Sequence, residues 1–213
     1  LGRAFLLATF PVAMTSAWLS PLTDGAIFSY FGSGVDAVST ATPLAVMKEQ
    51  GMAVFNEMFG APSEIYGTFF LGWRPGSIGE TSGLLILLGG LYLMYRRYIT
   101  WHIPVSLLGT LALLTWIFGG DTLFSGDPLL AILTGGALLG AFYMATDYVT
   151  SPTGRTAQLV YGAGIGALTV LIRLKGGYPE GFCYAILLMN PLSTVLEGLF
   201  RPKRFAPPAG GEK

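Results

Sequence analysis

A run of short polar residues at positions 36–42 ends in a hydroxyl group that could carry chemistry. The run reads Asp-Ala-Val-Ser-Thr-Ala-Thr, and Pro43 and Leu44 follow Thr42. Thr42 fits the N-cap position of a helix and Pro43 the first helical position. The plain interpretation is that Thr42 only caps a surface helix. The chemical interpretation is that it holds a phosphate, because a helix N-terminus offers unpaired N–H groups and a positive dipole.

A second candidate is the turn that contains Gly76, Ser77, Gly79, Glu80 and Thr81, just before an apolar run. A Gly-Ser turn at a helix start offers backbone N–H groups and hydroxyls to an anion. Glu80 is expected in the first turn of the following helix, where its charge complements the dipole. The alternative is that Ser77 and Glu80 only form a capping box.

A third candidate gathers oxygen-bearing side chains at the ends of two apolar stretches: Thr146, Asp147 and Thr150 at one, and Glu197 at the other. Hard cations prefer oxygen ligands, and ionisable groups at membrane depth are costly enough to suggest function. We therefore consider a cation path or a set of donors and acceptors for a cofactor. The alternative is that Asp147 is solvated or caps a helix, and that Glu197 extends to the interface.

The composition indicates a lipid solvent. Of 213 residues, 52% are hydrophobic and 11% are charged, with a mean hydropathy of +0.60; about 25% charged is usual for soluble domains. The formal net charge of zero suggests no nucleic-acid partner. The single cysteine excludes an internal disulfide, and no Ser-His-Asp set, P-loop, Rossmann fingerprint or metal motif is present.

The chain is predicted to be an all-α polytopic membrane protein with about six transmembrane helices, each needing roughly 20 mainly apolar residues. The expected spans are 1–18, 83–98, 103–118, 128–144, 157–174 and 182–200. Asn190 and Pro191 are expected to break the last one. Residues 1–206 form the membrane domain, and 207–213 read as a disordered tail. Because residue 1 already lies in a span, the chain looks like a fragment of a longer one.

Basic residues set the expected orientation. Arg96, Arg97, Arg155 and the cluster at 201–204 fall on one side if the spans alternate. The positive-inside rule then places both termini in the cytoplasm, N-in and C-in. The polar segment 20–81 becomes an extracytoplasmic loop without a strong span, and its length of about sixty residues suggests function.

Glycines recur at helical spacing inside the spans. Gly136 and Gly140 form one G-x-x-x-G pair, and Gly162 and Gly166 form another. The plain interpretation is tight packing of helices in lipid. The alternative is close approach of the backbone to a flat cofactor.

Four segments resemble the RnfD/NqrB family, the FMN-bearing membrane subunits of the Rnf and Nqr redox pumps. The run 36–42 is similar to the family's flavinylation motif D-x-x-(S/T)-x-A-T, although many members have Gly where Thr40 stands. The other similar segments, in the family's order, are 75–82, 142–152 and 177–190. The resemblance covers most of the chain, corresponds to the C-terminal portion of the family, and favours its Rnf members.

The resemblance implies that Thr42 carries FMN through a phosphoester bond, installed by a flavin transferase. It implies that the residues around this cofactor are Asp36, Ser39, Thr40, Ala41, Gly76, Ser77, Gly79, Glu80 and Thr81. For Thr146, Asp147, Thr150 and Glu197, an ion path competes with a second, non-covalent flavin such as riboflavin.

The resemblance also implies a function. The chain would be one subunit, inactive alone, of a complex in the bacterial inner membrane that moves electrons between ferredoxin and NAD and couples this to Na+ or H+ transport. Other subunits would be its partners. The alternatives are an NqrB-like subunit of a Na+-translocating NADH:quinone reductase, a non-redox permease, and a membrane scaffold.

Overall fold

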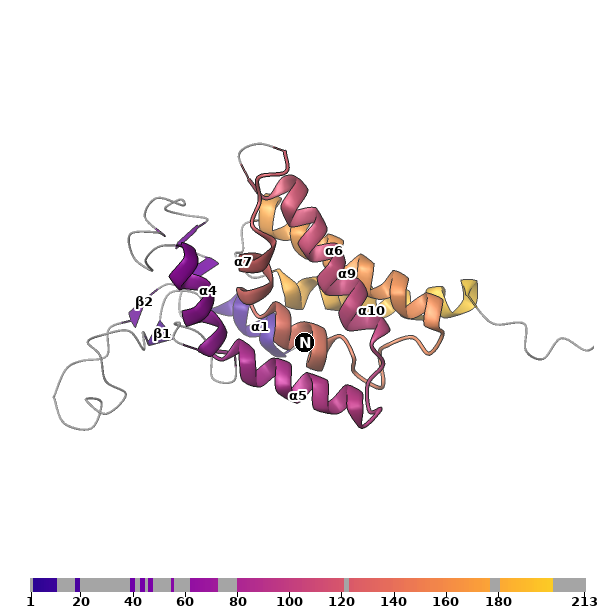
Figure 1. The fold of residues 1–213 in the computed structure, drawn as a ribbon. Coiled ribbons are helices and arrows are strands. Elements are labelled where there is room, and N and C mark those ends of the chain that lie inside the picture. The colour runs from indigo at the N-terminus through magenta and orange to yellow at the C-terminus, as the bar shows by residue number, and fades with distance from the viewer. Residues whose placement is uncertain are drawn as a thin grey trace, which may run out of the picture.

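The computed structural model describes residues 2–10, 18–19, 39–40, 43–44, 46–47, 55, 62–72, 80–120, 123–176 and 181–200. The helices are α1 (Gly2–Thr9), α4 (Pro62–Leu71), α5 (Gly83–Tyr95), α6 (His102–Phe118), α7 (Pro128–Leu133), α8 (Ala137–Leu139), the π-helical η2 (Gly140–Met144), α9 (Arg155–Lys175) and α10 (Phe182–Leu199). The short strands β1 (Trp18–Leu19) and β2 (Ser39–Thr40) pair antiparallel. The expected all-α class is confirmed, apart from this two-residue ladder. Figure 1 shows α4, β1 and β2 on one side of α5, α6, α9 and α10.

The helices α6 and α9 form the most extensive pair, and glycine makes their close approach possible. A β-carbon added at Gly162 would overlap the hydroxyl of Ser106, and one at Gly166 would lie 2.8 Å from the carbonyl oxygen of Leu107. Only hydrogen fits at these positions. The packing interpretation of this glycine pair is therefore confirmed.

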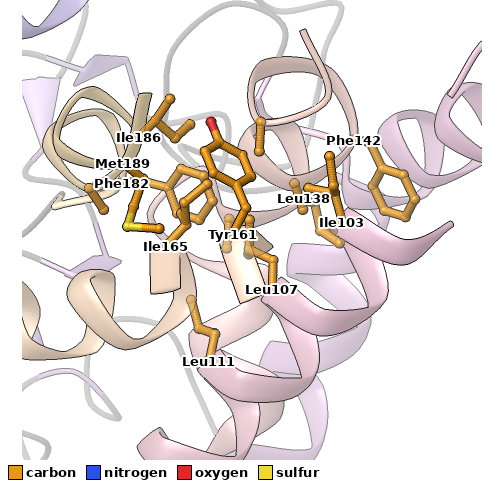
Figure 2. Close-up of a cluster of buried hydrophobic side chains, with 14 of the residues drawn as sticks. Ile103, Leu107, Leu111, Leu138, Phe142, Tyr161, Ile165, Phe182, Ile186 and Met189 are labelled. Carbon is orange, nitrogen blue, oxygen red and sulfur yellow. The ribbon is translucent and has the colours of Figure 1, made fainter. Parts of the chain in front are cut away.

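The main core lies where α6, α9, α10 and the 137–144 segment meet, with Tyr161 among the other side chains (Figure 2). Tyr161 is fully buried, and its hydroxyl donates to Oδ1 of Asn190 at 2.7 Å. The apolar side chains around it are Ile103, Leu107, Leu111, Leu138, Phe142, Ile165, Phe182, Ile186 and Met189. This core fixes the helices that position the polar groups at either end of α9.

Aromatic side chains of η2 occupy a glycine notch in α5. The ring of Phe142 would lie 2.6 Å from a β-carbon added at Gly90, and the Tyr143 hydroxyl would overlap one added at Gly89. The same hydroxyl donates to the carbonyl of Ile86 at 3.2 Å. These contacts hold α5 against the 137–144 segment.

Three expected spans, 103–118, 157–174 and 182–200, match the bounds of α6, α9 and α10 to within two residues. α5 ends at Tyr95 rather than at 98, because Arg97 has a φ of 59° and leaves the helical conformation. The expectation of one helix over 1–18 is wrong, since α1 ends at Thr9 and Trp18 lies in β1. The tail 207–213 lies outside the described residues.

Two further expectations about helices are wrong. The stretch 128–144 is interrupted between Leu133 and Ala137. α10 continues through Pro191, where a break was expected. The segment 20–81, expected to lack a strong span, contains the ten-residue helix α4. Pro62 at its start, with Ile65 and Phe69 one turn apart, was a signal for α4 that the hydropathy criterion passed over.

By length and composition, α9 and α10 could each cross a membrane, and α5 and α6 are apolar but shorter. Large apolar side chains on these helices are exposed, among them Leu85, Val105, Leu171 and Leu188. An apolar solvent accounts for such surfaces better than water does. The number of crossings and their orientation stay predictions.

Candidate functional site at a helix break

The described residues cover part of the predicted cofactor site. Asp36, Ala41, Thr42, Gly76, Ser77 and Gly79 lie outside them. Ser39 and Thr40 are described as strand backbone, and Glu80 and Thr81 directly precede α5. The site is therefore built from the segments that adjoin Thr42 and from Glu80.

The segment after Thr42 is helical, with Pro43 and Val46 buried and Leu44 and Met47 partly buried. Pro43, Leu44, Val46 and Met47 have helical backbone, as the sequence predicts for residues that follow an N-cap. Val46 belongs to a second hydrophobic core, separate from the main one, whose other members are Phe55, Ile65, Phe69 and Leu130. Because Ile65 and Phe69 belong to α4 and Leu130 to α7, this core fastens the segment to both helices.

α4 is tied to the start of α7 by a polar contact. The hydroxyl of Tyr66 donates to Oδ2 of Asp127, while Oδ1 of Asp127 caps α7 by accepting from the N–H groups of Leu129 and Leu130 at 3.0 and 3.1 Å. The hydrogen bond to Asp127, with a smaller contribution from burial, raises the pKa of Tyr66 to about 12. Sequence reasoning missed this pair, although Asp before Pro is a helix-start signal.

The helical backbone is interrupted just after α7. Thr134 is extended, and Gly135 and Gly136 have φ values of 63° and 65°. Residues with a β-carbon rarely adopt this left-handed conformation, so glycine suits both positions. The interpretation of Gly136 as a helix-packing residue is therefore wrong. Gly140 does lie in close packing, since a β-carbon added there would overlap the ring of Phe182.

Arg173, from the last turn of α9, binds the first side of the break. Its Nη1 donates to the carbonyl of Ala131 at 2.9 Å, and its Nη2 donates to the carbonyls of Thr134 at 3.1 Å and Gly135 at 3.4 Å. A guanidinium at a helix C-terminus meets unpaired carbonyls and the negative end of the dipole. The sequence alone did not single out Arg173 as a site residue.

Glu80 lies at the other side of the break. It is 6% exposed, and its Oε1 would lie 3.0 Å from a β-carbon added at Gly136, the residue before α8. The expectation that Glu80 lies in the first turn of α5 is wrong, because the N-cap of α5 is Ser82, which accepts from Leu85 N–H at 3.3 Å. A carboxylate at this place complements the partial positive charge of the unpaired N–H groups at the start of the helical segment 137–144.

Gly135 and Gly136 lie next to Arg173, Glu80 and the segment that follows Thr42, the residue predicted to bear the flavin. A β-carbon added at Gly135 would lie 2.5 Å from Nη2 of Arg173 and 3.0 Å from Cδ2 of Leu44. Leu44, the guanidinium and the bare glycine backbone are thus neighbours, with Glu80 at the next residue. An apolar stretch that contains a Thr-Gly-Gly sequence was the available signal for this break.

The remaining predicted site residues lie toward the opposite end of α9. Thr150 donates to Oδ2 of exposed Asp147 at 3.2 Å, whereas Thr146 donates to the carbonyl of Phe142 at 2.6 Å. Glu197 accepts from the N–H and the hydroxyl of Thr153 at 2.7 and 2.9 Å.

A pocket of about 390 Å³ adjoins Glu197 and is lined by Thr153, Gly154, Ala157, Thr194, Gly198 and Phe200. At 1.5 Å per helical residue, Arg155 and Arg173 are about 27 Å apart. The structure therefore does not place the Glu197 group with the break, and the predicted site residues divide between two regions.

Comparison with known proteins agrees with the resemblance in the sequence. The family model described as "NQR2, RnfD, RnfE family" matches residues 1–206. A Clostridium ljungdahlii protein, named as a subunit of a proton-translocating ferredoxin:NAD(+) oxidoreductase complex, is 52% identical over 96% of this chain and 59% of its own length. An Acetobacterium woodii protein, named as a subunit of a Na(+)-translocating ferredoxin:NAD(+) oxidoreductase complex, is 42% identical over 92% of this chain and 54% of its own. A Pseudomonas paraeruginosa protein, named as a subunit of an ion-translocating oxidoreductase complex, is 36% identical over 96% of this chain and 60% of its own. The chain thus spans somewhat over half the length of these curated relatives.

Proposed function

The chain belongs to the NQR2, RnfD, RnfE family, and from this premise we propose that it is part of the FMN-bearing membrane subunit of an ion-translocating ferredoxin:NAD+ oxidoreductase complex. The observation that carries the proposal is the seating of Leu44, two residues after Thr42, against a glycine break and a guanidinium. In this proposal Thr42 bears FMN through a phosphoester bond. The bound flavin supplies the acceptance and release of electrons.

The described residues fit an anionic, flat group. Arg173 provides a positive charge beside Leu44, and Gly135 and Gly136 leave backbone uncovered by side chains. A phosphodiester on Thr42 would have one negative charge to be balanced. Ser39 and Thr40 supply hydroxyl groups next to it in the chain, Glu80 lies at the break, and Thr81 follows Glu80 in the sequence.

The proposal includes a location and partners. The exposed apolar helices lie in the bacterial inner membrane with about six crossings, and the Thr42 loop faces away from the cytoplasm, where a flavin transferase reaches it. The other subunits of the complex pass electrons to and from this chain. An NqrB-like role would use the same site with a quinone as the complex's final acceptor.

The exposed end of α9 suits the proposed ion path better than it suits a second flavin. Asp147 is exposed and is paired with a threonine hydroxyl, a set of oxygens accessible to a hydrated cation. The names of two relatives specify H+ and Na+ respectively, and we propose transport of an ion of this kind.

Fluorescence on a denaturing gel tests the flavin proposal. The chain, produced in full length with its complex and the flavin transferase, is expected to give a fluorescent band that Thr42→Ala abolishes. Thr9→Ala removes an exposed hydroxyl of α1 outside the predicted site and is the matched control, expected to keep the band. A band that survives Thr42→Ala would contradict the proposal, and an unlabelled wild-type chain would favour a permease or a scaffold.

A further inference from the structure

The turn that ends α5 places an arginine where glycine is usual. The N–H of Tyr98 donates to the carbonyl of Leu93, and the N–H of Arg97 donates to the carbonyl of Met94, both at 3.0 Å. This pair of hydrogen bonds commonly ends a helix, with glycine in the left-handed position. Arg97 occupies that position with a φ of 59°. Because a residue with a β-carbon is less stable there than glycine, the backbone of the turn does not favour the residue that it holds.

Arg155 is a second arginine in an unfavourable place. It is the first residue of α9, whose first turn contains no acidic residue and whose N-cap, Gly154, makes no side-chain hydrogen bond. The N-terminus of a helix is the positive end of its dipole, so a cation there is destabilising. The dipoles therefore explain a cation after α5 but do not explain Arg155.

The side chain of Gln158 joins these two places. Its Oε1 accepts from the hydroxyl of Thr100 at 2.8 Å, and its Nε2 donates to the carbonyl of Pro152 at 2.9 Å. Gln158 lies three residues after Arg155 in α9. Thr100 lies three residues after Arg97, at most about 11 Å away along the chain. The turn after α5, the segment before α9 and the start of α9 therefore form one face of the molecule.

This face has a positive charge and exposed aromatic rings. Within the described residues none of its three exposed arginines forms an ion pair. Asp147, an exposed carboxylate of the segment before α9, accepts from Thr150, so three positive charges stand against one negative charge. We call this surface the arginine face and define it by its arginines and by four aromatic residues that are more than half exposed: Arg96, Arg97, Arg155, Tyr95, Tyr98, Trp101 and Tyr148.

The surroundings of the arginine face favour a lipid over a protein as its partner. α5 and α6 lead away from it with exposed apolar side chains, among them Leu88 and Val105. Tyrosine and tryptophan are enriched at the headgroup level of membranes, where one side of the ring is apolar and the other is wet. Arginine binds phosphate oxygens through two parallel N–H groups. A phospholipid joins a phosphate and apolar chains in one molecule, as this surface requires.

We propose that the arginine face binds the headgroup of an anionic phospholipid, with the phosphate between the turn after α5 and the start of α9. This inference rests on the proposed location in the bacterial inner membrane. The phosphate supplies the negative charge that the first turn of α9 lacks, and it offsets the unfavourable placement of Arg155. A zwitterionic lipid has the same phosphate but also an ammonium group, which the arginines repel. The bound lipid therefore ties the end of α5 to α9.

Quenching of tryptophan fluorescence by brominated lipids tests this inference in the intact complex with the full-length chain. The complex is placed in phosphatidylcholine vesicles that contain a varied fraction of brominated phosphatidylglycerol or of brominated phosphatidylcholine. Each protein is compared with the same protein carrying Trp101→Phe, and the difference gives the quenching of Trp101 alone. The ratio of the two apparent binding constants is the preference of the arginine face for the anionic lipid.

The wild-type protein is expected to prefer the anionic lipid by at least about tenfold, and less in high salt, because exposed charges are screened. Arg97→Gly should lower the preference about fivefold, which corresponds to about 1 kcal/mol for one basic residue near an anionic surface. This variant keeps the turn, since glycine suits the φ of 59°. Arg155→Gln should lower the preference by a similar factor, and Arg97→Lys should retain most of it.

Lys175→Gln is the matched control. Lys175 is exposed in the last turn of α9, about 26 Å from Gln158 along the helix, and its loss should leave the preference unchanged. An equal fall for Lys175→Gln and Arg97→Gly would overturn the inference, because the net charge of the chain would then be the cause.

Two further results would contradict the proposed lipid site. Equal quenching of Trp101 by the two lipids would make the arginine face an ordinary interfacial belt. No quenching by either lipid would mean that protein covers Trp101, in favour of an acidic partner subunit. Failure of the proposed function appears separately, as a flavin band that does not depend on Thr42.

Discussion

The two ends of α9 hold charged residues in opposite ways. At the C-terminal end, Arg173 binds three backbone carbonyls and Glu80 is nearly buried beside Gly136. At the N-terminal end, Arg155 and Asp147 are exposed, and polar side chains bond mainly to each other or to a neighbouring turn. Charges fixed by backbone geometry suit a group that stays in place, whereas exposed oxygens suit an ion that exchanges with solvent.

The largest effect is expected from closing the space at the break. Gly135→Ala introduces a β-carbon 2.5 Å from Nη2 of Arg173, at a φ of 63°. The left-handed conformation and the overlap together should lower the free energy of unfolding by about 3 kcal/mol. Unfolding by sodium dodecyl sulfate in mixed micelles measures this change in the free energy of unfolding. Gly67→Ala in α4, where nothing lies within 4 Å, is the control and should be neutral or stabilising.

Removing the charge of Glu80 should have the next largest effect. Glu80→Gln keeps the shape of the side chain but removes the negative charge that interacts with the N-terminus of α8. For a buried position this should lower the free energy of unfolding by about 1.5 kcal/mol. The same unfolding assay applies. Asp147→Gln lies at the exposed end and should cost much less; equal costs would remove the distinction between the two ends.

Tyr66→Phe tests the link between α4 and α7. It removes the hydrogen bond to Asp127, and because the pair is only partly buried we expect a loss of about 1 kcal/mol. Tyr92→Phe, on an exposed part of α5, should leave the stability unchanged. If both variants unfold alike, the hydrogen bond does not stabilise the loop end.

The same hydrogen bond predicts a dependence on pH. The pKa of Tyr66 is raised from 10.0 to about 12, so its contribution is complete below pH 10 and is lost as the pH rises through 12. The wild-type protein should lose its advantage over Tyr66→Phe within this window, in unfolding curves at successive pH values. A constant difference up to pH 12 would contradict this assignment.

The smallest effect is expected at the far end. Thr153→Ala removes the hydroxyl that donates to Glu197 but keeps the N–H that also donates to it. The loss should be about 0.5 kcal/mol or less. A loss above 2 kcal/mol would show that this end is held as firmly as the break.

Sequence reasoning predicted the helices well where apolar residues run on without interruption. α6, α9 and α10 match their expected bounds within two residues. An apolar run long enough to cross a bilayer can satisfy its backbone hydrogen bonds in few ways other than as a helix. Sequence reasoning was wrong at Pro191, where the helix continues, and at Gly135 and Gly136, where it stops. Hydropathy averaged over a whole span does not record where the helix inside it is interrupted, so it could not distinguish the two places.

The sequence by itself determined the helical class, the family and the residue proposed to bear FMN, because these depend on composition and on local order along the chain. Only the tertiary structure decided that Arg173 and Glu80, ninety-odd residues apart in the sequence, lie on adjacent glycines next to Leu44. The physical reason is that the left-handed backbone at the break is stabilised by groups from α9 and from the start of α5. No local pattern contains both.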